Sequence, residues 1–269
     1  MRAGAKRGGG EMIEYDDKAA RATERSYLSP EIVRQRLRTL EALALRAGEH
    51  VLDVGCGPGL LAHDMALQVG TSGRVAGIDK SEAMLKLARQ RCAHLSQVEL
   101  TQGEAENLCA DDQSFHALAC TQVLLYIPDV RQALSEMRRV SKPGGRIAVI
   151  ETDWRSAVLN SNEEVLTRKI TQGWDDAVPS PNLPVQLGPL LREHDFTAIR
   201  VEAIPVLDTS YSPDGFSAVM AKFIATSAQE RGLVSEAQAR TWLDDLERLE
   251  RDGAYFFCVN RFLFSAVKL

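Results

Sequence analysis

A glycine-rich segment is the part of this 269-residue sequence whose residue types and spacing best suit ligand chemistry. It reads VLDVGCGPGLLA and places Asp53, Gly55, Gly57 and Gly59 at alternate positions. Glycines let the backbone turn sharply and approach a ligand, and a following helix presents free N–H groups. A tight turn that binds nothing is the alternative. We favour a ligand-binding loop because a strand precedes the segment and a helix follows it.

The kind of ligand follows from what the segment lacks. It has no GK[ST] sequence, so it is not a triphosphate-binding loop. A dinucleotide fingerprint needs a third glycine where Leu60 stands. Asp79, twenty residues after Gly59, ends the next predicted strand, where a carboxylate can bind both ribose hydroxyls. Asp79 can instead cap the helix that begins at Ser81. The pattern indicates an adenosine-like ligand without a pyrophosphate.

The elements that hold these residues alternate between strands and helices. Short apolar runs predict strands over residues 50–54, 74–78, 98–101, 117–123 and 146–151. Helical spacing predicts helices over residues 60–69, 81–93 and 130–140. Continuous apolar strands between helices are typical of a parallel sheet covered on both faces. We therefore predict an α/β, doubly wound fold.

The flanking segments predict additional elements around this core. Residues 17–47 have helical spacing, with Ser29 as an N-cap and Gly48 at the end. Past residue 151 the pattern predicts helices over 162–174, 185–194, 216–230 and 235–251, strands over 198–207 and 254–269, and an irregular loop at VPSPNLP. We expect a disordered stretch over residues 1–16 and a single domain over 17–269, divided into a helical cap (17–47), a ligand-binding core (48–153), substrate or lid elements (154–252) and a final strand (253–269).

Composition narrows the classes of function. The net charge of −5 argues against a polyanion-binding surface, so no nucleic-acid partner is expected. Five scattered cysteines without a CxxC, and five histidines without metal spacing, favour neither disulfides nor a metal site. No apolar run reaches the length of a membrane span, and the basic N-terminus has no apolar stretch behind it. The expected location is cytoplasmic.

Four motifs give the sequence a family resemblance. DVGCGPG, GIDKSEAML, GEAENL and SKPGGRIAVIE resemble the class I S-adenosylmethionine-dependent methyltransferases, and within them the ubiquinone/menaquinone-biosynthesis type that methylates small molecules. The resemblance covers residues 45–153. It implies a Rossmann-like, seven-stranded, mostly parallel sheet whose last strand is antiparallel, here with N-terminal helices and a helical lid insertion. It also implies S-adenosylmethionine as the cofactor and S-adenosylhomocysteine as the product.

The resemblance assigns cofactor contacts by position. The loop glycines and Cys56 would line the methionine portion, Asp53 would hold the loop and through it the ammonium group, and Asp79 would bind the ribose. Glu104 stands where an aspartate is more usual, and His116 departs from the family pattern without an assigned role. The full set of implied cofactor residues is Tyr27, Asp53, Gly55, Cys56, Gly57, Gly59, Asp79, Lys80, Met84, Gly103, Glu104, Ala105, Gln122 and Val123.

Few residues offer acid–base chemistry near the methyl group. Ligands of doubly wound sheets bind beyond the carboxyl ends of the strands, which brings Tyr126, Asp153 and Trp154 close to the reaction. Asp153 is a candidate general base or substrate anchor; its alternative role is a helix cap or a surface carboxylate. Tyr126 is likewise a candidate general base or substrate anchor; its alternative role is packing under its loop. Trp154 and Trp174 are candidate walls for an aromatic substrate, although core packing is the more ordinary role for Trp174.

The functional hypothesis is methyl transfer to an O, N or C atom of a small, ring-containing metabolite. Base-amino methyltransferases carry an Asn/Asp-Pro-Pro-aromatic tetrad after the fourth strand, and this chain has TQVL there. An RNA or protein methyltransferase, and a cofactor-binding protein without methyl transfer, remain as alternatives. The helix over 235–251 carries an apolar stripe with Trp242 and Leu246, which fits a lid, a homodimer contact or a surface helix packed on the core.

Overall fold

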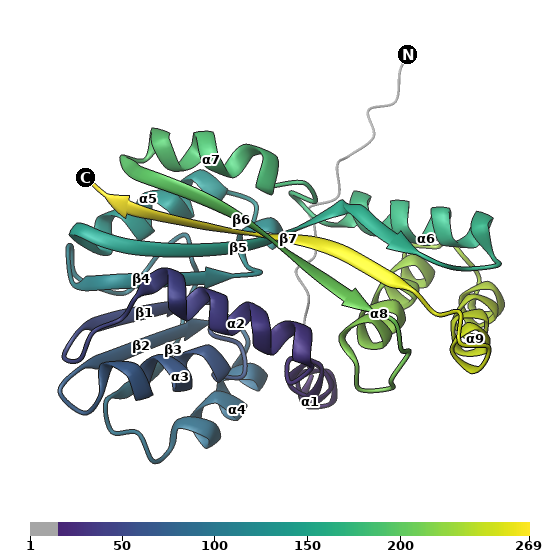
Figure 1. Cartoon of the computed structure of the whole chain (residues 1–269), viewed down its shortest axis with the longest axis horizontal. Helices are drawn as coiled ribbons and strands as arrows, with labels where there is room; N and C mark the ends of the chain where they lie inside the picture. The colour runs from purple at the N-terminus through teal and green to yellow at the C-terminus, as the bar shows by residue number, and fades with distance from the viewer. Residues whose placement is uncertain (1–15) are drawn as a thin grey trace.

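One seven-stranded sheet forms the centre of the molecule (Figure 1). The computed structural model describes residues 16–269, so the expectation for residues 1–15 lies outside the described part. The strand order is β3-β2-β1-β4-β5-β7-β6. Pairing is parallel from β3 to β5, whereas β7 runs antiparallel to both β5 and β6. The predicted fold class is confirmed. The strands are β1 (His50–Val54), β2 (Arg74–Asp79), β3 (Val98–Gln102), β4 (Phe115–Thr121), β5 (Ser141–Leu159), β6 (Phe196–Asp208) and β7 (Phe257–Lys268).

Helices cover both faces of this sheet. On one face Leu43 and Met65 pack against strand residues that include Val51, and on the other Leu134 packs against strand residues that include Leu118. Strands buried on both faces explain the continuous apolar runs of the sequence. The helices are α1 (Asp17–Ser26), α2 (Pro30–Leu43), α3 (Leu60–Val69), α4 (Glu82–Cys92), the short 3-10 helix η1 (Leu124–Tyr126), α5 (Val130–Val140), α6 (Glu164–Ala177), α7 (Pro184–Glu193), α8 (Phe216–Glu230) and α9 (Glu236–Arg251).

Strand β5 is much longer than the prediction of 146–151. It spans Ser141–Leu159, so the segment ETDWRS lies inside the strand instead of following it. The reason is pairing: β7 accompanies β5 from Arg146 to Leu159, with a register shift between Asp153 and Val158. Backbone hydrogen bonds to a partner extend a strand where no apolar run marks it.

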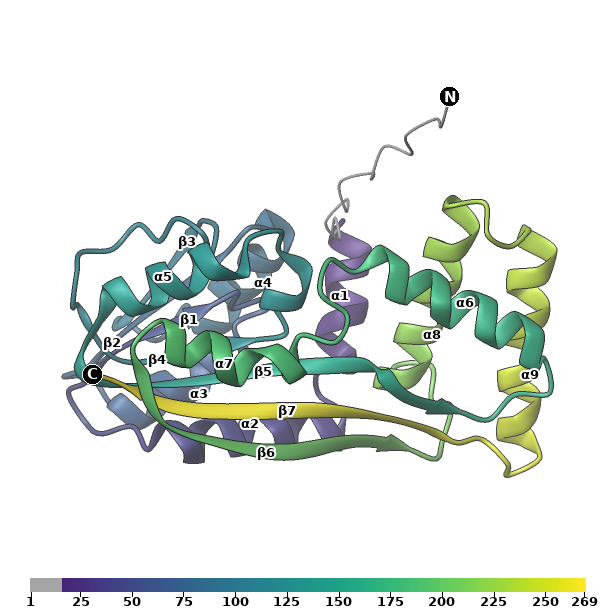
Figure 2. The same cartoon turned by 90° about the horizontal axis from the view of Figure 1, so that it is seen from above.

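The long strands carry three helices beyond the edge of the core. Figure 2 shows α6, α8 and α9 grouped at the far end of β5 and β7. Trp242 and Leu246 of α9 are fully buried, and the Trp242 indole N–H donates to Thr167 Oγ1 of α6 at 2.9 Å. The apolar stripe is therefore buried against other residues of the same chain. Trp242 and Leu246 pack inside the chain, as in the alternative of a helix packed on the core, and the expected homodimer stays a prediction.

The N-terminal helices bridge the core and this three-helix group. Helix α1 contacts both α4 and α8, and in Figure 2 it lies between the sheet and the three helices. Helix α2 ends at Leu43, with Ala44 in the left-handed conformation, before the predicted stop at Gly48. Ser29 occupies the N-cap position, but its hydroxyl has no hydrogen-bond partner among the described residues. Tyr27 falls in the turn that joins the two helices.

Candidate functional site

The glycine loop connects β1 to α3 at the carboxyl edge of the sheet. The Gly57 N–H donates to Asp79 Oδ2 and the Cys56 N–H donates to the Ile78 carbonyl, both at 2.8 Å. A Cβ added at Gly55 would come within 2.2 Å of Val123 Cγ2, so this glycine permits β4 to approach the loop. A Cβ at Gly57, where φ is +52°, would meet no protein atom within 4 Å. The loop is thus closed by protein at Gly55 and open to a ligand at Gly57.

Asp53 lies beneath this loop and is 1% exposed. Neither of its carboxylate oxygens makes a close hydrogen bond within residues 16–269, although the Ala62 N–H is near enough to lower its pKa slightly against the effect of burial. Burial raises the pKa of Asp53 to about 7, and the nearby negative charge of Asp79 adds to the effect. A buried carboxyl with so little hydrogen bonding is unusual in a folded protein. Its position suits a cationic ligand group, such as an ammonium, held through the loop.

Asp79 ends β2 and holds two backbone groups. It accepts hydrogen bonds from the N–H of Gly57 and of Ser81, each at 2.8 Å. Burial raises the pKa of Asp79, and these hydrogen bonds work in the opposite direction. Next to it, Lys80 and Glu104 form an exposed ion pair at 3.3 Å. The structure thus brings these three predicted residues together at one edge.

The other residues predicted to line the adenine are less accessible. Met84 is 3% exposed and packs with Ala20 and Leu87 beneath helix α1. Ala105 is also buried, whereas Gly103, whose N–H donates to the Asp79 carbonyl at 3.1 Å, is partly exposed. The backbone of this segment therefore lies beside Asp79 and remains accessible at Gly103.

The chain leaving β4 is fixed in an unusual conformation. Gln122 has a φ of +58°, and its N–H and its side-chain amide both donate to the Ile150 carbonyl, at 2.8 and 3.2 Å. The Gln122 side-chain oxygen accepts from the Thr152 hydroxyl. A left-handed residue that is not glycine costs conformational energy and is found frequently at functional sites. The surrounding hydrogen bonds hold Gln122 at the point where the resemblance places the sulfonium.

Glu151 supports the next residues from below. It is fully buried, and Oε1 accepts from the N–H groups of Val123 at 3.2 Å and Leu124 at 2.8 Å. Burial raises its pKa to about 8 although these hydrogen bonds lower it. The Glu151 carboxyl is therefore mostly protonated at neutral pH. It positions the turn after β4 through backbone contacts.

Four aromatic rings stand beyond this turn. Trp174 of α6 is the centre of the group: its ring centroid lies 5.8 Å from Trp154, 6.4 Å from Tyr126 and 5.4 Å from Phe223 of α8, all edge-to-face. We call Tyr126, Trp154, Trp174 and Phe223 the aromatic wall. Among the described residues, the buried indole N–H of Trp174 has no acceptor, whereas the Trp154 side chain is near enough to the Tyr126 hydroxyl to lower its pKa through a hydrogen bond. An unpaired donor in an apolar wall suits a ligand that combines a flat ring with an acceptor oxygen.

Two further predicted residues, Tyr27 and Asp153, are each half-buried. Tyr27 is half-buried, and burial raises the pKa of its hydroxyl, while the charge of Arg261 lowers it and that of Asp79 raises it. The Tyr27 hydroxyl therefore lies close enough to Asp79 and to Arg261 for the charges of both residues to shift its pKa. Asp153 is half-buried within β5, and its Oδ1 accepts from the Arg155 N–H at 3.2 Å. The expectation that Asp153 lies in a loop after the strand is wrong, because β5 continues past it.

Comparison with known proteins decides the family. A family model described as a methyltransferase domain matches residues 45–182, about half of the chain. The chain belongs to the class I S-adenosylmethionine-dependent methyltransferases. It is 41% identical over 122 residues to demethylmenaquinone methyltransferase from Listeria welshimeri, covering 45% of this chain and 52% of that protein. It is 32% identical over 229 residues to an uncharacterized 37.1 kDa protein in a transposon of Streptomyces fradiae, covering 84% of this chain and 65% of that protein.

A solved structure adds one further relative. The crystal structure of the [4+2]-cyclase SpnF has 25% identity and a TM-score of 0.59, covering 87% of this chain and 80% of that one. The methyltransferase spans about half the length of the demethylmenaquinone relatives that it matches. The family model, which matches residues 45–182, includes the stretch 45–153 that carries the resemblance. S-adenosylmethionine is the cofactor of this family.

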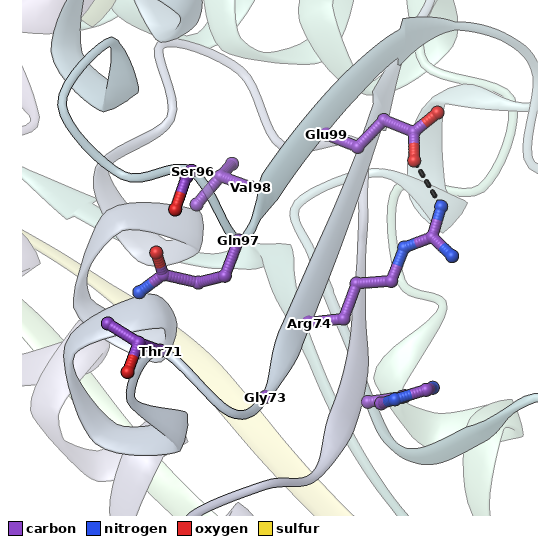
Figure 3. Close-up of a pocket in the computed structure, with 8 residues that line it drawn as sticks. Thr71, Gly73, Arg74, Ser96, Gln97, Val98 and Glu99 are labelled. Carbon is purple, nitrogen blue, oxygen red and sulfur yellow. Dashed lines mark hydrogen bonds and ion pairs between the residues drawn. The ribbon is translucent and has the colours of Figure 1, made fainter.

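The rest of the described structure offers no competing centre. Within residues 16–269 no group of three or more His, Cys, Asp or Glu side chains could hold a metal ion, and no helix is long and apolar enough to cross a membrane. Burial raises the pKa of Cys56, which argues against a thiolate nucleophile in the loop. A hollow at the opposite, amino edge of the sheet is open and polar (Figure 3), and its charged residues Arg74 and Glu99 pair with each other.

Three residues of this site are not singled out by the sequence. The sequence places Glu151 at the end of a strand, Phe223 in a helix and Arg261 in the last strand, each without a role. Arg261 is 2% exposed and occupies a core-facing position of the alternating strand β7. Along the alternating strand, Arg261 stands at a position whose neighbours of the same face are apolar. A charged residue at such a position can be recognised in the sequence. Nothing in the sequence links Phe223 to Trp174, which lie far apart along the chain.

Proposed function

We propose that this chain transfers a methyl group from S-adenosylmethionine to an O, N or C atom of a small, ring-containing molecule. The observation that carries the proposal is the aromatic wall just beyond Gln122 and Val123, in which the buried indole N–H of Trp174 has no acceptor among the described residues. An aromatic wall favours a flat apolar acceptor over a charged macromolecule. The net charge of −5 supports the same choice. The names of the demethylmenaquinone relatives, which refer to a quinone-type ring, point in this direction too.

The chain's own residues have two tasks in this reaction. Asp53, Asp79 and the glycine loop bind and orient the cofactor at the carboxyl edge of β1 and β2. Gln122, held at a positive φ, and Glu151, through the N–H groups of Val123 and Leu124, fix the turn where the methyl group would be presented. The aromatic wall and α1 exclude water and orient the acceptor ring.

The chemistry itself needs little from the protein. When bound, S-adenosylmethionine supplies an activated methyl group, whose S–C bond breaks with its electron pair left on sulfur while the acceptor atom bonds to carbon. Positioning in line with that bond accounts for most of the required acceleration. Tyr126 and Asp153 are our candidates for receiving a proton or anchoring the acceptor. Burial raises the pKa of Tyr126 above its usual value, so it would act as a hydrogen-bond donor before it acts as a base.

A methyl-transfer assay with a panel of ring-containing acceptors, including naphthohydroquinones and simple phenols, tests the proposal. Formation of S-adenosylhomocysteine should depend on a ring acceptor and fall by about tenfold or more in Trp174→Ala, while cofactor affinity stays unchanged. Leu37→Ala, which truncates an exposed side chain on α2, is the control and should behave as the wild type. Turnover on RNA or a protein acceptor, and none on ring compounds, would contradict the proposal.

One observation favours a second candidate. The second candidate is a protein that binds the cofactor without transferring its methyl group. The similarity to a [4+2]-cyclase shows that this fold is not limited to proteins named as methyltransferases. Cofactor binding without any formation of S-adenosylhomocysteine across the acceptor panel would support this second candidate.

A further inference from the structure

Arg261 is a buried cation without a buried anion beside it. It lies on β7, paired in register with Thr152 of β5, and is 2% exposed. No carboxylate lies within 4.0 Å of its guanidinium in the part of the chain that the structure describes. An isolated buried charge is costly, and arginine cannot avoid the cost by losing its proton. A protein retains such a group where something else supplies the counter-charge.

The neighbours of Arg261 hold its plane and leave donors free. Its Nε donates to Thr152 Oγ1 at 3.2 Å, and Nη1 donates to the side-chain oxygen of Gln35. The guanidinium carbon lies 4.5 Å from the centre of the Phe216 ring, at a cation–π distance. A guanidinium has five N–H donors, and these contacts use two of them. Neutral partners thus orient the group without cancelling its charge.

The position of Arg261 connects it to the reaction centre. Thr152, which accepts from Arg261, donates in turn to Gln122 at the end of β4. The hydroxyls of Tyr27 and Tyr126 both respond to the charge of Arg261, which lowers the pKa of each against the effect of burial. Arg261 therefore faces the junction between the cofactor edge and the aromatic wall.

Glu151 is the acidic group whose negative charge could balance the positive charge of Arg261, but its carboxyl is mostly uncharged at neutral pH. The charge of Arg261 acts on it, but burial dominates and raises the Glu151 pKa to about 8. At neutral pH the carboxyl is mostly protonated, so the junction keeps a net positive charge. This is the electrostatic setting that attracts an acidic oxygen.

We propose that Arg261 is the binding residue for the oxyanion of a phenol-type acceptor whose ring packs on the aromatic wall. The inference rests on the proposed function and narrows its substrate class to aromatic rings that carry an ionised hydroxyl. The charges balance: the acceptor anion donates an electron pair to the methyl carbon, the sulfonium sulfur keeps the pair of the broken bond, and both products are uncharged there. Because the acceptor arrives deprotonated, no general base is needed at the transfer step.

A purely structural role for Arg261 leads to a different expectation. A neutral residue such as glutamine could still hydrogen-bond to Thr152 and Gln35, so those contacts alone do not need the positive charge. The test must therefore measure the preference of the pocket for an anion, independently of turnover.

Equilibrium binding of two matched probes makes this measurement. The probes are 4-nitrophenol, followed by the absorbance of its phenolate, and its uncharged methyl ether 4-nitroanisole, followed by quenching of tryptophan fluorescence, both with S-adenosylhomocysteine present. We expect the wild-type protein to bind the phenolate at least about tenfold more tightly than the ether. Arg261→Gln should bind the two probes about equally, and Arg261→Lys should keep most of the preference. Arg200→Gln, which neutralises an exposed arginine of β6, is the matched control and should keep all of it.

The outcomes separate this inference from the proposed function. Equal affinity of the wild type for the two probes, or binding of neither while S-adenosylhomocysteine still binds, overturns the role of Arg261 and leaves methyl transfer standing. An unchanged preference in Arg261→Gln overturns it as well. If Arg261→Gln does not fold, the wild-type preference and its retention in Arg261→Lys still decide the question. Absence of S-adenosylhomocysteine binding by the wild type would instead contradict the proposed function itself.

Discussion

The backbone N–H of Gly57 donates a 2.8 Å hydrogen bond to the carboxylate of Asp79. This bond joins the loop after β1 to the end of β2, so the proposed methionine and ribose contacts are parts of one unit. The second Asp79 oxygen accepts from Ser81 and so fixes the carboxylate relative to α4. A change at Asp79 should therefore affect the loop as well as the ribose contact.

Replacing Asp79 by alanine should abolish tight binding of the cofactor product. The variant loses a charged acceptor for the ribose and the hydrogen bond that orders Gly57, which predicts a loss of affinity of about 100-fold or more. Calorimetric titration with S-adenosylhomocysteine measures it. Asp111→Ala removes an exposed carboxylate and is the control. A change of less than about threefold for Asp79→Ala would contradict its role.

Gly57→Ala should fold and yet bind the cofactor product weakly. The new Cβ meets no protein atom within 4 Å, so the cost to the fold is the left-handed φ alone, about 1–2 kcal/mol. The same methyl group enters the space assigned to the ligand. Gly144→Ala is a close match, since Gly144 also has a positive φ and open space, at the far end of the sheet. Thermal melting should drop similarly in both variants, and S-adenosylhomocysteine affinity should drop only in Gly57→Ala.

Binding of S-adenosylhomocysteine should strengthen as the pH rises through 7. Burial raises the pKa of Asp53 to about 7, so roughly half of the molecules carry a neutral carboxyl at that pH. The ligand's ammonium group favours the ionised form, so binding releases a proton from Asp53. Calorimetry at pH 7 in buffers of different ionisation enthalpy should detect that release. Asp53→Asn should bind more weakly and without it; proton release that persists in this variant would contradict the assignment.

The sequence places Asp53, the glycine loop and Asp79 next to one another. It also names Tyr126, Trp154 and Trp174 as candidates on the acceptor side, but it does not show that their rings meet or that Phe223 joins them. Asp53, the loop glycines and Asp79 lie within one strand–turn–helix–strand stretch, so local order along the chain places them in space. The aromatic wall combines Tyr126 and Trp154 with Trp174 of α6 and Phe223 of α8, whose meeting depends on how long strands carry distant helices. That length arises from β5–β7 pairing, which leaves no periodic apolar signal. The sequence also does not identify a role for Arg261, because that role depends on which charged groups surround it in the fold.

Glu151→Gln should reduce the fall in unfolding free energy between pH 7 and 9. The folded-state pKa of Glu151 is about 8, above its unfolded value near 4.3, so the folded state binds the extra proton between these values. Stability therefore falls as the pH rises, and the cost between pH 7 and 9 is about 1 kcal/mol. Glutamine keeps the side-chain oxygen that accepts from Val123 and Leu124 and cannot ionise. Denaturant unfolding of the apo-protein at both pH values measures the slope. Glu247→Gln, at an exposed site, should match the wild type; an equal slope in Glu151→Gln would refute the assignment.

Asp245→Asn should loosen the three-helix group without weakening cofactor binding. The buried Asp245 carboxylate on α9 accepts from the hydroxyl of Ser161 at 2.9 Å, and from the backbone and side-chain N–H groups of Asn162 at 2.7 and 3.0 Å. Burial alone would raise its pKa, but these bonds and Arg248 bring it to about 2. The stabilisation is present above the unfolded value near 3.9 and is lost as the pH falls toward 2.

An asparagine at position 245 places a donor among these donors, so we expect a loss of about 2 kcal/mol in unfolding free energy at pH 7. Because α6 carries Trp174, the affinity for ring probes such as 4-nitrophenol should fall with it, while calorimetry with S-adenosylhomocysteine should show no change. Asp244→Asn, which alters the neighbouring exposed carboxylate, is the matched control. Equal effects of the two substitutions on ring binding would show that the contacts of α9 do not position the aromatic wall.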